Sequence, residues 1–121
     1  MKKDPGIYLL HIRDALDSIE RYTYQGEAFF FADEKTQDAV IYNLAIIGEA
    51  VKQLPKAIRN QHASIPWKKI AGMRDVIIHD YDRTEIRTIW NVVHRDLPLL
   101  RKMIELLLEE HCSKSPRSCS P

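Results

Sequence analysis

The residues best suited to chemistry lie in one short segment, 74–81, which reads Arg-Asp-Val-Ile-Ile-His-Asp-Tyr. The guanidinium of Arg74 is a permanent planar cation that suits a phosphate or a developing oxyanion. The imidazole of His79, with an unperturbed pKa of about 6.5, can transfer protons near neutral pH. Tyr81 adds a phenol, so a cation, a base and a hydroxyl fall within about two helical turns.

Asp75 lies one turn before His79 and can accept a hydrogen bond from the imidazole, which would fix its tautomer and favour its protonated form. On a helical wheel, Arg74 and Tyr81 fall at one edge of the apolar stripe, whereas Asp75 and His79 fall together on the opposite side. A surface ion pair beside a buried tyrosine accounts for the same spacing. Spacing alone does not choose between this structural interpretation and a catalytic one.

Two arginines beyond this segment, Arg83 and Arg87, are four residues apart and form a small basic face with Arg74. They could contact backbone phosphates of a nucleic acid, although a solvated helix face more often explains such a pair. No metal site is predicted, because the histidine and aspartates of segment 79–82 match no zinc or calcium spacing. The sequence also has no glycine-rich phosphate loop and no nucleophile elbow.

The whole chain has 121 residues, a formal net charge of +1 and 45% hydrophobic residues, which fits one ordinary globular domain. This balance gives no chain-wide signature of nucleic-acid binding. No apolar run suits a membrane span, and the first residues lack the apolar core of a signal peptide, so a cytoplasmic location is expected. Both cysteines, Cys112 and Cys119, lie near the end of the chain. We expect a helical domain over residues 1–110 and a loose tail over 111–121, without a framework disulfide.

The elements that must position the segment 74–81 are helices. Asp4 followed by Pro5 predicts the start of a first helix that runs to about Tyr24. Asp33 can cap a second helix whose apolar arc is broad enough for two packing partners, the domain's own core and a second copy of the chain. The arc consists of a heptad seam, Val40, Leu44, Ile47, Val51 and Leu54, widened by Ala39, Ile46 and Ala50.

Gly48 lies inside this second helix, where glycine is less favourable than alanine by about 1 kcal/mol. A close approach of a neighbouring helix is the expected compensation. The adjacent Glu49 is either a solvated charge or part of a buried polar contact. Three consecutive aromatic residues, 29–31, are expected to dock the preceding connection against the core.

A third helix opens at Pro66 and Trp67 and carries the segment 74–81, with Ile70, Met73 and Ile77 as its core stripe. The pair Asp82 and Glu85 resembles a capping box for a fourth helix. In that helix, Pro98 predicts a kink over residues 94–98 rather than two separate helices. The predicted fold class is all-α, an antiparallel bundle of four main helices with a kinked last helix.

With the sequence around them, Arg74, His79 and Tyr81 resemble the motif of the HEPN superfamily, and specifically that of the HepT-like toxins. The polar residue that typically follows the arginine is supplied by Asp75. The likeness covers about residues 5–108. It includes Asn-Leu-Ala-Ile-Ile-Gly-Glu-Ala at 43–50, Ile-Pro-Trp at 65–67, Gly-Met-Arg at 72–74, Ile-Trp at 89–90 and Asp-Leu-Pro at 96–98.

This resemblance implies a metal-independent ribonuclease without a cofactor, acting on mRNA or tRNA as a homodimer whose two motifs face each other. Our hypothesis is that His79 acts as general base on a ribose 2′-hydroxyl and that Arg74 stabilises the charge on the attacked phosphate, with Asp75 in support. If a regular helix separates Arg74 from His79, either the helix ends before His79 or a second chain completes the site. The broad apolar arc of the second helix is one candidate dimer surface, and the fourth helix is another.

The resemblance also implies a partner, a minimal nucleotidyltransferase antitoxin. That enzyme would transfer AMP groups from ATP to Tyr81 and so silence the toxin. Two other classes stay open, namely a catalytically silent bundle that docks a nucleotidyltransferase, and a bundle that binds a nucleotide or another small ligand without cleaving it.

Overall fold

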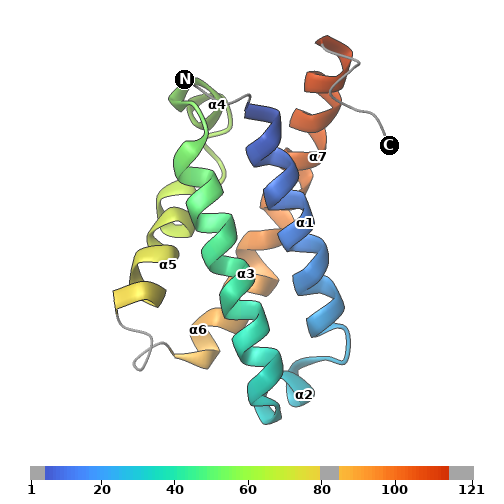
Figure 1. Cartoon of the computed structure of the whole chain (residues 1–121), viewed down its shortest axis with the longest axis vertical. Coiled ribbons are helices and arrows are strands. Elements are labelled where there is room, and N and C mark those ends of the chain that lie inside the picture. The colour runs from blue at the N-terminus through green and yellow to red at the C-terminus, as the bar shows by residue number, and fades with distance from the viewer. Residues whose placement is uncertain (1–4, 80–84, 115–121) are drawn as a thin grey trace.

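The computed structural model describes residues 5–79 and 85–114, with side chains assigned at all of these positions except 78, 79 and 111–114. Four long helices run antiparallel (Figure 1), with α1 (Pro5–Thr23) and α5 (Trp67–His79) pointing one way and α3 (Glu34–Gln53) and α7 (Leu97–Lys114) the other. Within the described residues, three short helices accompany them, α2 (Glu27–Ala32), α4 (Lys56–Gln61) and α6 (Ile86–Asn91). The described residues contain no strand, so the predicted all-α bundle is confirmed.

Local sequence sets the ends of the first two long helices. The chain turns after α1 at Gly26, whose φ of 94° lies in the left-handed region that favours glycine. The predicted cap of α3 is confirmed, because Asp33 Oδ2 accepts a hydrogen bond from the backbone N–H of Thr36 at 3.2 Å. At the other end of α3, Leu54 is extended, with φ −69° and ψ 141°. This is the conformation that a following proline, Pro55, imposes.

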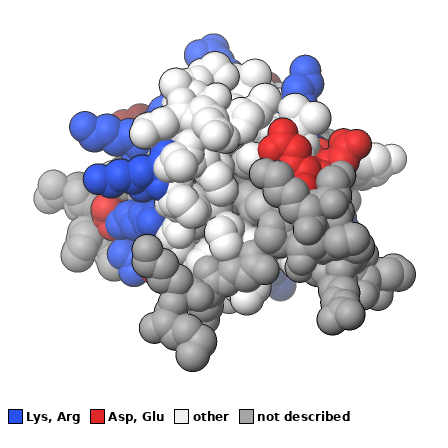
Figure 2. Space-filling model, turned by 90° about the horizontal axis from the view of Figure 1, so that it is seen from above, with Lys and Arg blue, Asp and Glu red and all other residues white. Residues whose placement is uncertain are grey.

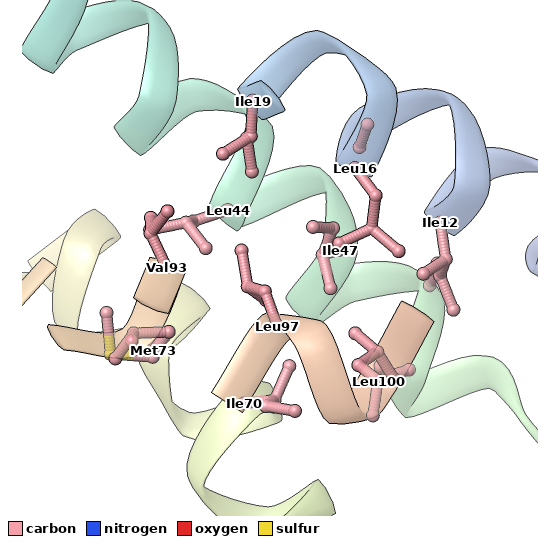
Figure 3. Close-up of a cluster of buried hydrophobic side chains, with 14 of the residues drawn as sticks. Ile12, Leu16, Ile19, Leu44, Ile47, Ile70, Met73, Val93, Leu97 and Leu100 are labelled. Atoms are coloured by element: carbon pink, nitrogen blue, oxygen red, sulfur yellow. The ribbon is translucent and has the colours of Figure 1, made fainter. Parts of the chain in front are cut away.

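The predicted seam of α3 lies at the centre of the hydrophobic core, and all of its residues are buried. The core stripe predicted on α5 is also buried. Figure 3 shows how side chains from α1, α3, α5 and the last helical segment meet in one cluster. Its labelled members are Ile12, Leu16, Ile19, Leu44, Ile47, Ile70, Met73, Val93, Leu97 and Leu100.

The connection between α1 and α3 contains the helix α2, which carries the three consecutive phenylalanines. Phe30 is fully buried, and its ring centroid lies 4.9 Å from that of Trp90. Phe31 is partly buried beside it, whereas Phe29 remains exposed. The expected docking of this connection against the core is therefore confirmed, chiefly through Phe30.

The last helix is irregular where its proline predicts a kink. Between α6 and α7 the chain forms one π-helical turn, η2 (Val92–Asp96), and the backbone N–H of Leu97 donates to the carbonyl of Val92. Pro98 has no N–H to donate to the preceding turn, and a widened turn of this kind re-pairs the neighbouring backbone groups. The helical backbone continues through the turn, as the prediction of a single helix rather than two requires.

The boundaries of the last helix differ from their predictions at both ends. Glu85 is extended and α6 begins only at Ile86, without a side-chain cap. The capping box therefore does not place Glu85 inside the helix, and its other member, Asp82, lies outside the described residues. At the far end α7 continues to Lys114, so it includes the first four residues of the predicted loose tail. The rest of that predicted tail, 115–121, also lies outside the described residues.

Candidate active site

Gly48 determines how closely α3 approaches α5. A Cβ placed on Gly48 would lie 2.7 Å from the Cβ of Arg74 and 3.2 Å from the carbonyl oxygen of Ile70. Any side chain at position 48 would therefore push the two helices apart. The expected close approach of a neighbouring helix is confirmed, and it occurs at the arginine of the motif.

The guanidinium of Arg74 is held by two carboxylates. Its Nε lies 3.1 Å from Oε2 of Glu49 on α3, and its Nη1 lies 3.3 Å from Oδ1 of Asp75. The side chain of Arg74 is 34% exposed. The cation is therefore oriented by partners on two helices, yet remains open to solvent and to an incoming anion. Glu49 combines features of both open interpretations. Its carboxylate is half exposed, as a solvated charge would be, but it also pairs with Arg74.

Lys52 is the strongest partner of Asp75. Its Nζ donates to Asp75 Oδ1 at 2.7 Å, and this hydrogen bond is the main reason that the pKa of Asp75 lies below its ordinary value of 3.8. Arg74 lowers the pKa further, while partial desolvation opposes both effects. Asp75 is therefore a carboxylate at neutral pH, and its described partners are cations on α3 and on its own helix.

His79 is the last residue of α5. Because the backbone is helical through this residue, the alternative in which the helix ends before His79 is wrong. The backbone positions of Arg74 and His79 keep the separation of a regular helix, about 140° around the axis for five residues. The predicted pairing of Asp75 with the His79 imidazole stays a prediction. Tyr81 and Arg83 lie outside the described residues.

Arg87 contributes to a different part of the molecule. It forms an ion pair with Glu27 of α2, and its guanidinium lies over the ring of Phe31, 4.4 Å from the ring centroid. None of the described contacts joins Arg87 to Arg74. The basic face that the sequence suggests for Arg74, Arg83 and Arg87 stays a prediction, and the contacts of Arg87 link α6 to α2.

A shallow groove of about 590 Å³ lies beside Arg74, between α1 and α3. Tyr42 is 68% exposed at its edge, and Ile46 is only partly buried. The groove therefore exposes a second apolar face of α3 next to the arginine. It is lined by Tyr8, His11, Tyr42, Ala45, Ile46, Glu49, Ala50, Gln53 and Arg74.

The described part of the chain offers neither a metal site nor a membrane span. Within it, no three or more His, Cys, Asp or Glu side chains are grouped as metal ligands would be. No helix in it is long and apolar enough to cross a membrane.

Comparison with known proteins gives a family for this arrangement. The family model described as "Ribonuclease HepT-like" matches residues 12–107, a range that contains Gly48, Glu49, Arg74, Asp75 and His79. The chain belongs to the HepT-like ribonuclease family. No solved structure matches it.

Two relatives named as ribonucleases match this chain over most of its length. A protein named as a probable ribonuclease HepT, from Thermococcus cleftensis, is 41% identical over 109 residues, or 88% of this chain and 98% of the relative. A protein named as a putative RNase, from Caldanaerobacter subterraneus subsp. tengcongensis, is 40% identical over 109 residues, or 89% of this chain and 97% of the relative.

A third relative is longer. It is named as a gamma-glutamylcyclotransferase and putative RNase, from Methanocaldococcus jannaschii, and is 43% identical over 111 residues, which are 91% of this chain. The match covers 50% of that relative, so the HepT-like chain spans about half of its length.

Sequence reasoning identified Arg74 and Asp75 but missed how Glu49 and Lys52 hold them. Both partners lie on α3, three residues apart and next to Gly48, on the face that meets α5. A glycine that predicts a close helix approach, followed by charges of both signs, is the signal that indicates these contacts.

Proposed function

We propose that this chain is the toxin of a toxin–antitoxin pair, a metal-independent endoribonuclease that cleaves mRNA or tRNA in the cytoplasm. Membership of the HepT-like ribonuclease family supports the activity. The observation that carries the assignment to this site is the guanidinium of Arg74, which Glu49 and Asp75 orient at a partly exposed position five residues before His79.

The chemistry begins at a ribose 2′-hydroxyl. His79 accepts its proton while the 2′-oxygen attacks the adjacent phosphorus, and the bond from phosphorus to the 5′-oxygen breaks. The leaving oxygen takes a proton from a second His79, and the products are a 2′,3′-cyclic phosphate and a 5′-hydroxyl. Arg74 stabilises the additional negative charge on the phosphate during this step. Asp75 stays ionised and holds the guanidinium in place.

Two copies of the chain form the complete site in this proposal. The α5 helix keeps Arg74 and His79 on different sides of its axis, so the Arg74 of one copy works with the His79 of the other. The apolar face of α3 beside Arg74, with Tyr42, Ala45 and Ile46, supplies a surface for the second copy. Exposed aromatic and aliphatic side chains of this kind are typical of interface cores.

A nucleotidyltransferase antitoxin controls the toxin by transferring AMP from ATP to the hydroxyl of Tyr81, with release of pyrophosphate. The attached group brings a negatively charged phosphodiester and a bulky nucleoside to the motif. Its charge and its volume both oppose an RNA phosphate at the site.

The structure of the reaction products tests the proposed reaction. Unmodified protein is incubated with RNA, with the same strand carrying 2′-O-methyl groups, and with DNA. We expect cleavage of the unmodified RNA alone and fragments with 5′-hydroxyl ends, which polynucleotide kinase labels without prior dephosphorylation. Fragments with 5′-phosphate ends, or cleavage of the 2′-O-methyl strand, would exclude attack by the 2′-hydroxyl. Binding of RNA without any cleavage would favour the catalytically silent bundle.

Intact-mass measurement tests the control. After incubation with the nucleotidyltransferase and ATP, the wild type should gain one or more AMP-sized increments and lose its activity. Tyr81→Phe should gain none, whereas a control variant with the exposed Tyr24 changed, Tyr24→Phe, should behave as the wild type. Modification that persists in Tyr81→Phe would move the modified residue elsewhere.

A further inference from the structure

A second groove, larger and strongly basic, lies where the end of α3, the helix α4 and the first half of α5 meet. Its volume is about 1110 Å³. It is lined by five of the chain's 18 Lys and Arg residues but by one of its 17 Asp and Glu residues, Asp75. The cations are Lys52, Lys56, Arg59, Lys68 and Lys69. In Figure 2, which looks onto the end of the bundle that carries α4, Lys and Arg gather on the left flank.

Two of the five cations already have anionic partners. Lys52 is paired with Asp75 at 2.7 Å, and Lys69 is paired with Asp96 of η2 at 2.8 Å. Within the described part of the chain, no carboxylate lies within ion-pair distance of Lys56, Arg59 or Lys68. These three cations are therefore the ones available to an external anion.

The Nε of Arg59 is a buried donor without a hydrogen-bond partner. Arg59 as a whole is only partly buried and lines the groove. Its guanidinium therefore adds positive charge there, which favours an anion in the groove.

The other groups that line the groove are not suited to stacking on bases. Trp67 is 6% exposed, and its indole N–H donates to the carbonyl of His62 at 2.9 Å. The remaining walls are formed by short or aliphatic side chains and the amide of Asn60. Single-stranded RNA that is recognised through its bases normally stacks them on exposed aromatic rings. The groove therefore fits the phosphate backbone of a strand better than its bases.

Asp75 joins this groove to the candidate active site. Its Oδ1 contacts Lys52, which lines the groove, and also Arg74, which lines the neighbouring groove between α1 and α3. The basic groove and the Arg74 side of α5 are therefore neighbours, with the ion pair of Lys52 and Asp75 between them.

We propose that this groove binds the phosphate backbone of the substrate RNA, independently of its sequence, and leads the strand to Arg74. The proposal rests on the proposed ribonuclease function. Phosphate contacts of this kind supply affinity and register but no sequence information. The groove therefore governs how tightly RNA binds and leaves the rate of the chemical step unchanged.

The test compares two double variants of the full chain, each of which loses two exposed lysines. Lys56→Ala with Lys68→Ala removes two of the three unpaired cations of the groove, and Lys35→Ala with Lys102→Ala removes the same charge elsewhere. The probe is a fluorescent 20-nucleotide 2′-O-methyl RNA, either oligo(U) or oligo(A), whose Kd is measured by anisotropy at several salt concentrations. This probe has no free 2′-hydroxyl, so the measurement does not depend on cleavage. Circular dichroism confirms that both variants fold.

For the groove variant we expect a Kd that is about 2- to 30-fold higher for both probes, because each of the two exposed ion pairs contributes about 1.4- to 5-fold. The slope of log Kd against log salt should fall by about 1.4, since each contact with a single strand contributes about 0.7. On cleavable RNA, KM should rise while kcat stays the same. The control variant should match the wild type in all of these quantities.

Equal Kd values and salt slopes for the groove and control variants would overturn the proposal, even if the wild type cleaves RNA. A groove variant that binds RNA normally but loses the nucleotidyltransferase would also overturn it and would assign the surface to a protein. Conversely, the predicted loss of binding in a protein that cleaves nothing would support the groove and reject only the ribonuclease.

Discussion

Gly48 of α3 lies directly against Arg74 of α5, so closely that a Cβ at position 48 would be 2.7 Å from the Cβ of the arginine. The next residue on α3, Glu49, pairs with the guanidinium of the same arginine. The glycine therefore sets the distance between the helices, and the glutamate sets the direction of the cation. Both effects act on the side chain to which the proposed chemistry assigns transition-state stabilisation.

Replacing Gly48 by alanine should destabilise the protein and reduce RNA cleavage. Overpacking typically destabilises a protein by about 1–3 kcal/mol, and the better helix propensity of alanine offsets about 1 kcal/mol of this. The matched control is Gly72→Ala in α5, where no atom lies within 4 Å of the added Cβ, so this variant should be as stable as the wild type or slightly more stable. Urea denaturation of both variants measures the difference. If Gly48→Ala is as stable as Gly72→Ala, the close contact does not constrain the helices.

Arg74→Lys should retain the fold but lose most of the activity. Lysine keeps the positive charge, but it cannot pair with Glu49 through one nitrogen and with Asp75 through another. We expect a loss of kcat on the order of 100- to 1,000-fold for Arg74→Ala and a smaller loss for Arg74→Lys. The free energy of unfolding of both variants should stay within about 1 kcal/mol of the wild type, because exposed ion pairs contribute little. Single-turnover cleavage and thermal denaturation measure the two effects. Full activity in Arg74→Ala would remove this residue from the mechanism.

Lys52→Ala should raise the pKa of Asp75 toward its ordinary value of 3.8, because the hydrogen bond from Lys52 is the largest cause of its lowering. Since the pKa is lower in the folded state, the contribution of this pair to stability is present above pH 3.8 and is lost as the pH falls through the lowered pKa. Carbon-detected NMR titration of the Asp75 carboxyl measures the shift. An identical titration in the wild type and in Lys52→Ala would show that the 2.7 Å contact does not persist in solution.

Tyr42→Glu should prevent formation of the proposed homodimer and abolish cleavage, because it places a charge in the apolar face of α3 beside Arg74. Tyr24→Glu is the control, since Tyr24 is also exposed but lies after the end of α1. Light scattering after size-exclusion chromatography gives the mass of each variant. A dimeric and active Tyr42→Glu would assign the interface to another surface, such as the last helix.

The helices and the core could be predicted because their signals lie within single helices. The seam from Val40 to Leu54 follows a heptad, Asp33 is a cap, and Pro98 indicates an irregular turn. Each of these features depends on residues a few positions apart. For the same reason, the sequence indicated that a helix must approach Gly48, although not which side chain it would bring.

The partners of the motif could not be predicted, because they depend on how α3 is rotated against α5. Lys52 and Asp75 are 23 residues apart, and no periodicity relates them. Arg87 illustrates the same limit, since no local pattern indicates its ion pair with Glu27, 60 residues away. The predicted capping box was wrong for a different reason. Glu85 is extended and α6 begins at the next residue, Ile86, so Glu85 does not lie in the first turn of the helix.

The central claim is that His79 and Arg74 cleave RNA without a metal ion. The most direct measurement is the initial rate of cleavage of total cellular RNA in EDTA by unmodified wild type, by His79→Ala, and by His94→Ala as a control, since His94 is exposed on η2 beside Trp90. The wild type and His94→Ala should cleave at similar rates, and His79→Ala should be on the order of 100-fold slower or more. Equal cleavage by the wild type and His79→Ala, or no cleavage of any cellular RNA by the wild type, would contradict the claim.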